Sequence, residues 1–282
     1  MTDSPLAILQ AANLYVYGIN NPVRWNDPSG LSVIGAIIRM AQEGNDAGAH
    51  ALAYAVVNGS PISIAQSGNN VGIVAFVDIS GGHSPIGNVA EINRIAASLG
   101  LPTRPEHTHR EAVVHGLANL WAGSFDGLNV SVTIIERGNS ALAYSPGQAF
   151  LSIDIIDGGG VSRVVGNDSP WSITNPGRVM LFTHHGGGGE RTFEQAAWTA
   201  AHELGHAMGI GDGWGYGYPR VSNLAGQIIV ESIYQYGNII SMMTKPLDPV
   251  TRFDVEMALR AHRYNEWQTW NNNPLLPLAI RR

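Results

Sequence analysis

The sequence predicts an α+β fold with a mixed β-sheet. Three strand patterns, LNVSVTIIE, AFLSIDIID and GRVMLFTHH, follow one another in the second half of the chain. A long helical pattern starts after the third of them, and another lies near the end, at residues 251–264. Strands grouped in this way, with helices before and after them, favour a layered α+β domain over a regular βαβ winding.

The first half of the chain mixes helix and strand patterns. Apolar spacing predicts a helix at residues 32–42, and residues 49–57 fit a second short helix or a strand. The apolar, β-branched run at 71–79 predicts a buried strand. Residues 89–100 predict an amphipathic helix that ends at its terminal glycine. Two prolines and clustered polar residues at 101–111 then indicate a domain boundary.

The second half of the chain supplies most of the expected sheet and its covering helices. Thr192 is a good N-cap for the longest helix, which we expect to stop at Gly209. Strands are expected at 128–136, 149–157 and 177–185, and helices at 111–125, 193–208 and 251–264.

Composition argues against several classes of function. The chain of 282 residues has no cysteine, so any metal must be held by His, Asp or Glu. The net charge of −6 argues against non-specific binding to nucleic acids or anionic membranes, which depends on a basic surface. We find neither the pattern of a signal peptide nor an apolar run of about 18 residues, so we expect no membrane span.

The stretch AHELGHAMGIGD, residues 201–212, carries the strongest chemical signal. Residues four apart share a face of a helix, so His202 and His206 can reach one metal ion. Glu203 is turned one position round the helix, where a carboxylate would hold a water molecule rather than the metal. Gly209 allows a sharp bend, after which Asp212 can return as a third ligand. Two imidazoles and one carboxylate leave an open position on zinc, as catalytic sites do.

The third ligand has a second candidate. Glu231 lies 25 residues after His206 in a stretch that fits a helix, and a later glutamate completes the zinc site in the gluzincin group of HExxH proteins. We favour Asp212, because the position of Gly209 agrees with it. An accidental HExxH on a solvated helix face is the remaining alternative.

The full pattern His202-Glu203-x-x-His206-x-x-Gly209-x-x-Asp212 resembles the metzincin metallopeptidases, and its terminal aspartate is similar to their snapalysin-like branch. The resemblance covers about residues 106–270. It implies a Zn²⁺ ion, a general base at Glu203, an active-site helix and a C-terminal helix. It also implies a methionine-bearing turn beneath the metal, for which Met242 and Met243 are the candidates. Thr244 and Lys245 stand where some metzincins have a tyrosine.

Residues 13–31 alternate apolar and polar side chains and then break into turns, as in a β-hairpin. The residues Asn13-Leu14-Tyr15, Asn20-Asn21-Pro22 and Asp27-Pro28-Ser29-Gly30-Leu31 resemble the end of the Rhs/YD-repeat core. In that family the signature separates a conserved shell from a variable toxin. Members that cleave themselves after the leucine use two DPxG motifs, and only the second is intact here.

Together the patterns predict three parts: the end of an Rhs core at 1–31, a linker or pre-toxin subdomain at 32–105, and a zinc metallopeptidase toxin domain at 106–282. The resemblance implies an endopeptidase that is secreted or delivered into a target cell, acts on a protein or peptide, and has a cognate immunity protein as a possible partner. The alternatives are a zinc-binding module without catalysis and a toxin of another chemistry, such as a nuclease.

Three further groups could contribute to the site. His184 and His185 precede a run of four glycines and could line a cleft or lie in an exposed loop. Aromatic residues alternate with glycines at 213–219, where they could contact a substrate or cover a core. We expect His107, His109 and His115 to be surface or satisfied groups rather than ligands.

Overall fold

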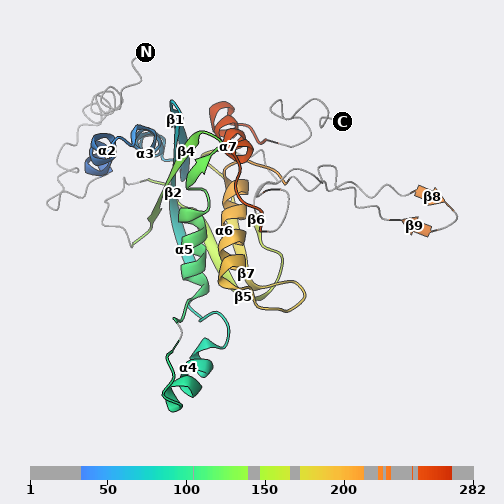
Figure 1. The fold of residues 1–282 in the computed structure, drawn as a ribbon. Helices are drawn as coiled ribbons and strands as arrows, with labels where there is room; N and C mark the ends of the chain where they lie inside the picture. The colour runs from blue at the N-terminus through green and yellow to red at the C-terminus, as the bar shows by residue number, and fades with distance from the viewer. Residues whose placement is uncertain are drawn as a thin grey trace.

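The computed structural model describes residues 33–103, 105–138, 147–165, 172–212, 222–224, 227–229, 243 and 247–268. Within these residues it has six helices, a seven-stranded mixed sheet and a separate two-stranded sheet (Figure 1). The predicted α+β class with a mixed sheet is therefore confirmed. The hairpin predicted at 13–31 lies outside the described residues.

The elements follow one another as two helices, a hairpin of strands, two more helices, five strands, the long helix α6, a small hairpin and a last helix. The helices are α2 Val33–Gln42, α3 Asp46–Asn58, α4 Val89–Ser98, α5 His109–Asn119, α6 Phe193–Ala207 and α7 Arg252–Tyr264. The strands are β1 Ile62–Ser67, β2 Asn70–Gly81, β3 Gly123–Phe125, β4 Leu128–Glu136, β5 Leu151–Gly159, β6 Arg163–Val165, β7 Arg178–His184, β8 Ser222–Leu224 and β9 Gln227–Ile229.

The large sheet has the strand order β3-β4-β2-β5-β7-β6, with β1 also paired to β2. Strands β4, β2, β5 and β7 are mutually parallel, and β1, β3 and β6 run antiparallel to their partners. The long strand β2 pairs with β1 over its first half and with β5 over its second half. Strand β6 ends the described sheet on the side of β7, and its residues Arg163 and Val164 line the same pocket as His202 and His206.

Helices cover both faces of the sheet, and β2 divides its side chains between them. Val71, Ile73, Ala75, Val77 and Ile79 join a core with side chains of α5, α6 and α7. The alternate residues Val74 and Phe76 join a second core with side chains of α2 and α3. Figure 1 shows α5 and α6 side by side on one face of the sheet, and α4 extending away from it.

Several element predictions are confirmed, and the differences have local causes. Residues 49–57, which fitted a helix or a strand, belong to helix α3. The helix predicted at 111–125 is wrong beyond Asn119, because the chain turns there and Gly123–Phe125 pairs with β4. Strands β1 and β6 were not predicted. The segment 32–105, expected to be a linker or pre-toxin subdomain, supplies β2, which lies between β4 and β5.

No helix within the described ranges is both long and apolar enough to cross a bilayer.

Candidate metal centre

Helix α6 carries all three candidate residues of the HExxH motif, His202, Glu203 and His206. The predicted N-cap is confirmed: Thr192 accepts a hydrogen bond from the backbone N–H of Gln195, whose side chain accepts one from the N–H of Thr192. This reciprocal capping fixes the start of the helix. His202 is 6% exposed and Glu203 is 3% exposed, so the motif lies at the buried side of α6 rather than on a solvated face.

The chain leaves α6 through a tight turn at Gly209. This residue has φ +91°, a conformation that side chains with a Cβ rarely adopt. The ring Nδ1 of His206 lies 2.8 Å from the carbonyl oxygen of Ile210 just beyond the turn. With Nδ1–H donating to this carbonyl, the tautomer leaves Nε2 with its lone pair available for a metal ion.

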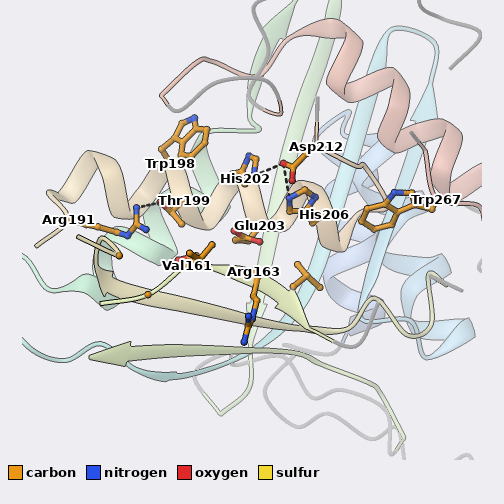
Figure 2. Close-up of a pocket in the computed structure, with 14 residues that line it drawn as sticks. Val161, Arg163, Arg191, Trp198, Thr199, His202, Glu203, His206, Asp212 and Trp267 are labelled. Atoms are coloured by element: carbon orange, nitrogen blue, oxygen red, sulfur yellow. Dashed lines mark hydrogen bonds and ion pairs between the residues drawn. The ribbon is translucent and has the colours of Figure 1, made fainter. Parts of the chain in front are cut away.

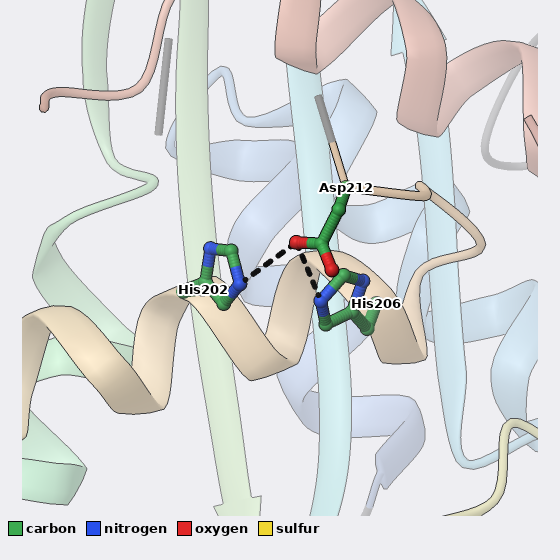
Figure 3. A group of neighbouring side chains, drawn as sticks. All are labelled: His202, His206 and Asp212. Atoms are coloured by element: carbon green, nitrogen blue, oxygen red, sulfur yellow. Dashed lines mark ion pairs between the residues drawn. The ribbon is translucent and has the colours of Figure 1, made fainter. Parts of the chain in front are cut away.

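The turn brings Asp212 back to the two histidines (Figure 3). Its Oδ1 lies 3.3 Å from Nε2 of His202 and 3.3 Å from Nε2 of His206. One ligand atom from each of the three residues can be chosen so that all lie within 4.8 Å of one another. Among the residues that the structure describes, this is the one group of three or more such side chains that could hold a metal ion.

The charges of His206 and Asp212 depend strongly on each other. Burial lowers the pKa of His206, but its hydrogen bond to Asp212 and the negative charge of that carboxylate outweigh the burial and raise the pKa to about 9. Burial likewise opposes the charge of Asp212, yet contacts with His202 and His206 hold the pKa of its carboxyl below the ordinary value. Without metal, the positive charge of protonated His206 therefore balances the carboxylate of Asp212.

Glu203 lies beside this group and has a different environment (Figure 2). Its Oε2 is buried and has no hydrogen-bond partner among the described residues. Burial raises the pKa of Glu203, although the nearby charges of His206 and His202 oppose the increase. A buried carboxylate oxygen without a partner costs free energy unless a ligand or water occupies the adjacent space. Glu203 thus lines the cleft and has one carboxylate oxygen whose hydrogen-bonding capacity the described residues leave unused.

Arg191 places a half-buried positive charge in the lining of the same cleft. Its Nε donates to the carbonyl oxygen of Phe182 at 3.0 Å, and its Nη1 donates to Oγ1 of Thr199 at 3.2 Å. Burial lowers the pKa of Arg191, and the charge of Glu203 opposes this effect. The two charges therefore stabilise each other across the wall of the cleft.

The candidate ligands and Glu203 line a cleft of about 670 Å³. One wall comes from α6, including Trp198 and Thr199, and the facing wall comes from residues 160–164, which lead into and form part of the edge strand β6. The Trp198 ring stacks on His202 with their centroids 4.9 Å apart. Trp267 closes the cleft near His206.

Met243, one of the two residues predicted for the methionine turn, is fully buried in the core under α6. A Cβ atom built on Gly205 would lie 2.7 Å from its Sδ, so the methionine touches the helix between the two candidate histidine ligands. Met242 and Glu231 lie outside the described residues. Asp212 is therefore the candidate third ligand that the described residues bring to the histidines.

The remaining candidates lie elsewhere or play other roles. His184 and His185 do not line the cleft; their ring nitrogens contact Thr183 and Gln195. The aromatic stretch at 213–219 lies outside the described residues. Sequence reasoning did not identify the cleft residues Arg191, Trp198 and Trp267. Trp198 had a usable signal, because it precedes His202 by one helical turn.

Comparison with protein-family models, with curated proteins and with solved structures finds no match for this chain.

Proposed function

We propose that this protein is a zinc-dependent endopeptidase whose metal is held by His202, His206 and Asp212. The observation that carries the proposal is the separation of 3.3 Å between the Asp212 carboxylate oxygen and each histidine Nε2. Ligand atoms on a tetrahedral zinc ion at about 2.0–2.1 Å lie about 3.3–3.4 Å apart. The donor set and the spacing both fit zinc.

The site has the composition of a catalytic centre rather than a structural one. Structural zinc sites use four protein ligands, whereas catalytic sites use three and leave a position open. Three candidate ligands are present among the described residues, and all three line the cleft. Glu203 lies in this cleft with a buried oxygen that makes no hydrogen bond among the described residues.

Each residue has a role in peptide hydrolysis. When bound, zinc supplies Lewis acidity, which polarises the scissile carbonyl and lowers the pKa of a water molecule. Glu203 accepts the proton of that water and then donates it to the leaving amine. Its raised pKa suits both steps, because a carboxyl group that takes and returns a proton works best near the ambient pH. The charge of Arg191 is among the nearby charges that oppose this increase in the pKa of Glu203.

The shape of the cleft supports an extended peptide as substrate. Strand β6 is the last strand on its side of the described sheet, and residues 160–164 face the candidate ligands across the cleft. A peptide can add to an edge strand through main-chain hydrogen bonds, which hold it straight while its side chains alternate between pockets. Binding of this kind recognises backbone along a segment and favours cleavage within a chain.

The N-terminal pattern supports a role in delivery. Residues 13–31 resemble the end of an Rhs core, which in that family precedes a toxin domain. On this basis we propose that the peptidase is the effector part of an Rhs-type protein, is secreted or delivered into a target cell, and is blocked in the producing cell by a cognate immunity protein.

A peptide-cleavage screen tests the proposed activity. The zinc-loaded protein is incubated with a proteome-derived peptide library, and new termini are identified by mass spectrometry. We expect cleavage by the wild type, a loss of about 100-fold or more in Glu203→Gln, and retained zinc in that variant. The matched control is Glu190→Gln, a carboxylate outside the cleft lining. Zinc binding without any cleavage would instead favour an inert zinc-binding module.

A further inference from the structure

We propose that the residues following α7, Asn265–Gln268, form a positioning element of the metal site. We call these four residues the C-terminal strap. The strap fixes the turn that carries Asp212 and supports the ring of His206, so that tight metal binding depends on it. This inference rests on the proposed metal centre, and its test separates the two.

The first observation is a pair of backbone hydrogen bonds. The N–H of Gln268 donates to the carbonyl oxygen of Gly209 at 2.8 Å, and the N–H of Gly211 donates to the carbonyl oxygen of Gln268 at 2.9 Å. Together they make a parallel bridge between Ile210 and Gln268. The two hydrogen bonds thus flank Ile210, whose carbonyl oxygen accepts the hydrogen bond from the ring of His206.

The second observation concerns the tryptophan of the strap. The ring of Trp267 lies nearly parallel to that of His206, with an interplanar angle of 12° and centroids 6.2 Å apart. Its indole also lies close to the backbone of the turn. A Cβ atom built on Gly211 would be 3.0 Å from the indole Nε1. Figure 2 shows Trp267 beside His206 at one end of the cleft. One side chain therefore contacts the turn next to Asp212 and flanks a second candidate ligand.

The strap is itself held in place by contacts with other parts of the chain. The N–H of Glu266 donates to the carbonyl oxygen of Ala261 in the last turn of α7. Oδ1 of Asn265 accepts a hydrogen bond of 3.1 Å from the N–H of Ile173. Trp267 packs with Ile173 and Ala261 in a small apolar cluster. The strap is therefore tied to α7 and to a separate segment of the chain as well as to the turn.

The need for such a support follows from the sequence of the turn. Asp212 comes after Gly209 and Gly211, and glycines leave a chain more conformations to lose when a ligand is fixed. A ligand that is already held in place costs less to bind. Residues that orient metal ligands typically change metal affinity by about 10–100-fold when altered, so we expect an effect of this size from the strap.

The test compares Gln268→Pro with Gln268→Ala in the full chain. Proline removes the N–H that donates to Gly209, whereas alanine keeps both backbone groups and removes only a side chain that bonds within the strap, to Glu266. Trp267→Ala tests the second contact independently, and Tyr54→Ala is its control at an exposed aromatic residue on α3. Zinc affinity is measured by competition with a chromophoric chelator, and circular dichroism of the metal-free proteins checks folding.

We expect Gln268→Pro to bind zinc about 10-fold or more weakly than Gln268→Ala, and Trp267→Ala to bind it about 10-fold or more weakly than the wild type. Tyr54→Ala should stay within about twofold of the wild type. Asp212→Ala serves as the reference for loss of a ligand. Wild-type affinity in folded Gln268→Pro and Trp267→Ala, beside weak binding in Asp212→Ala, would overturn the role of the strap and leave the metal centre intact. If proline prevents folding, Trp267→Ala alone decides. Absence of zinc binding in the wild type would overturn both proposals.

Discussion

Gly205 and Met243 are in close contact beneath the candidate metal ligands, and enlarging the glycine should perturb this contact. A Cβ at position 205 would lie 2.7 Å from Sδ and 3.2 Å from Cε of Met243, and 3.2 Å from Cζ2 of Trp121. Met243 and Trp121 are both fully buried, so neither has open space to move into. In Gly205→Ala the core must therefore shift or become strained.

The expected size of the effect combines two opposing contributions. Alanine in place of glycine within a helix stabilises by about 1 kcal/mol, whereas overpacking of a filled core costs about 1–3 kcal/mol. Gly205→Ala should therefore lower the free energy of unfolding by up to about 2 kcal/mol. Met243→Ala should lower it by about 2–5 kcal/mol through the cavity that it creates. In the double variant Gly205→Ala, Met243→Ala the new Cβ atom has room, so the helix-stabilising effect of alanine should contribute to the free energy of unfolding.

A double-mutant cycle in urea, with metal-free protein, measures this coupling. We expect the double variant to be more stable than the sum of the single effects by about 1–3 kcal/mol. Additivity within about 0.5 kcal/mol would refute the contact between Met243 and α6, and with it the assignment of Met243 to the predicted methionine turn.

Three further predictions concern the metal and its helix. Because the pKa of His206 is raised to about 9, zinc must displace a proton from this ring at neutral pH, so zinc affinity should fall about 10-fold per pH unit below 9. Calorimetry in two buffers should detect one proton released on binding, and a zinc affinity that does not depend on pH would contradict this. In the metal-free protein, protonation of His206 should stabilise the folded state fully below about pH 6.5, and this stabilisation should be lost as the pH rises through about 9. In His206→Gln, urea unfolding at a series of pH values should no longer show this loss. Zinc at about 100 times its dissociation constant should stabilise the fold by about 2.7 kcal/mol, seen as a higher melting temperature that a chelator reverses; an unchanged melting temperature would argue against binding to the folded state.

The sequence alone identified the parts of the site that local rules determine. Helical periodicity placed His202 and His206 on one face, and Gly209 marked the turn before Asp212. Thr192 predicted the start of α6 because N-capping depends on residues only three positions apart. These predictions needed no knowledge of which elements meet in space.

The parts that depend on tertiary contacts were not predictable in this way. Arg191 reaches Phe182 and Thr199 only because β7 and α6 pack together. Trp267 and Gln268 meet the ligand turn after a separation of more than fifty residues, and no periodicity in the sequence signals such a pairing. The edge strand β6 has three residues, too few for an alternating pattern to be recognised.

The central claim is that His202, His206 and Asp212 hold one divalent metal ion. Anomalous X-ray diffraction at the zinc edge, from crystals of zinc-loaded protein, locates that ion directly. We expect a single strong peak about 2.0–2.2 Å from Nε2 of both histidines and from a carboxylate oxygen of Asp212. A peak at another place, or one bound by Glu231 instead of Asp212, would contradict the account.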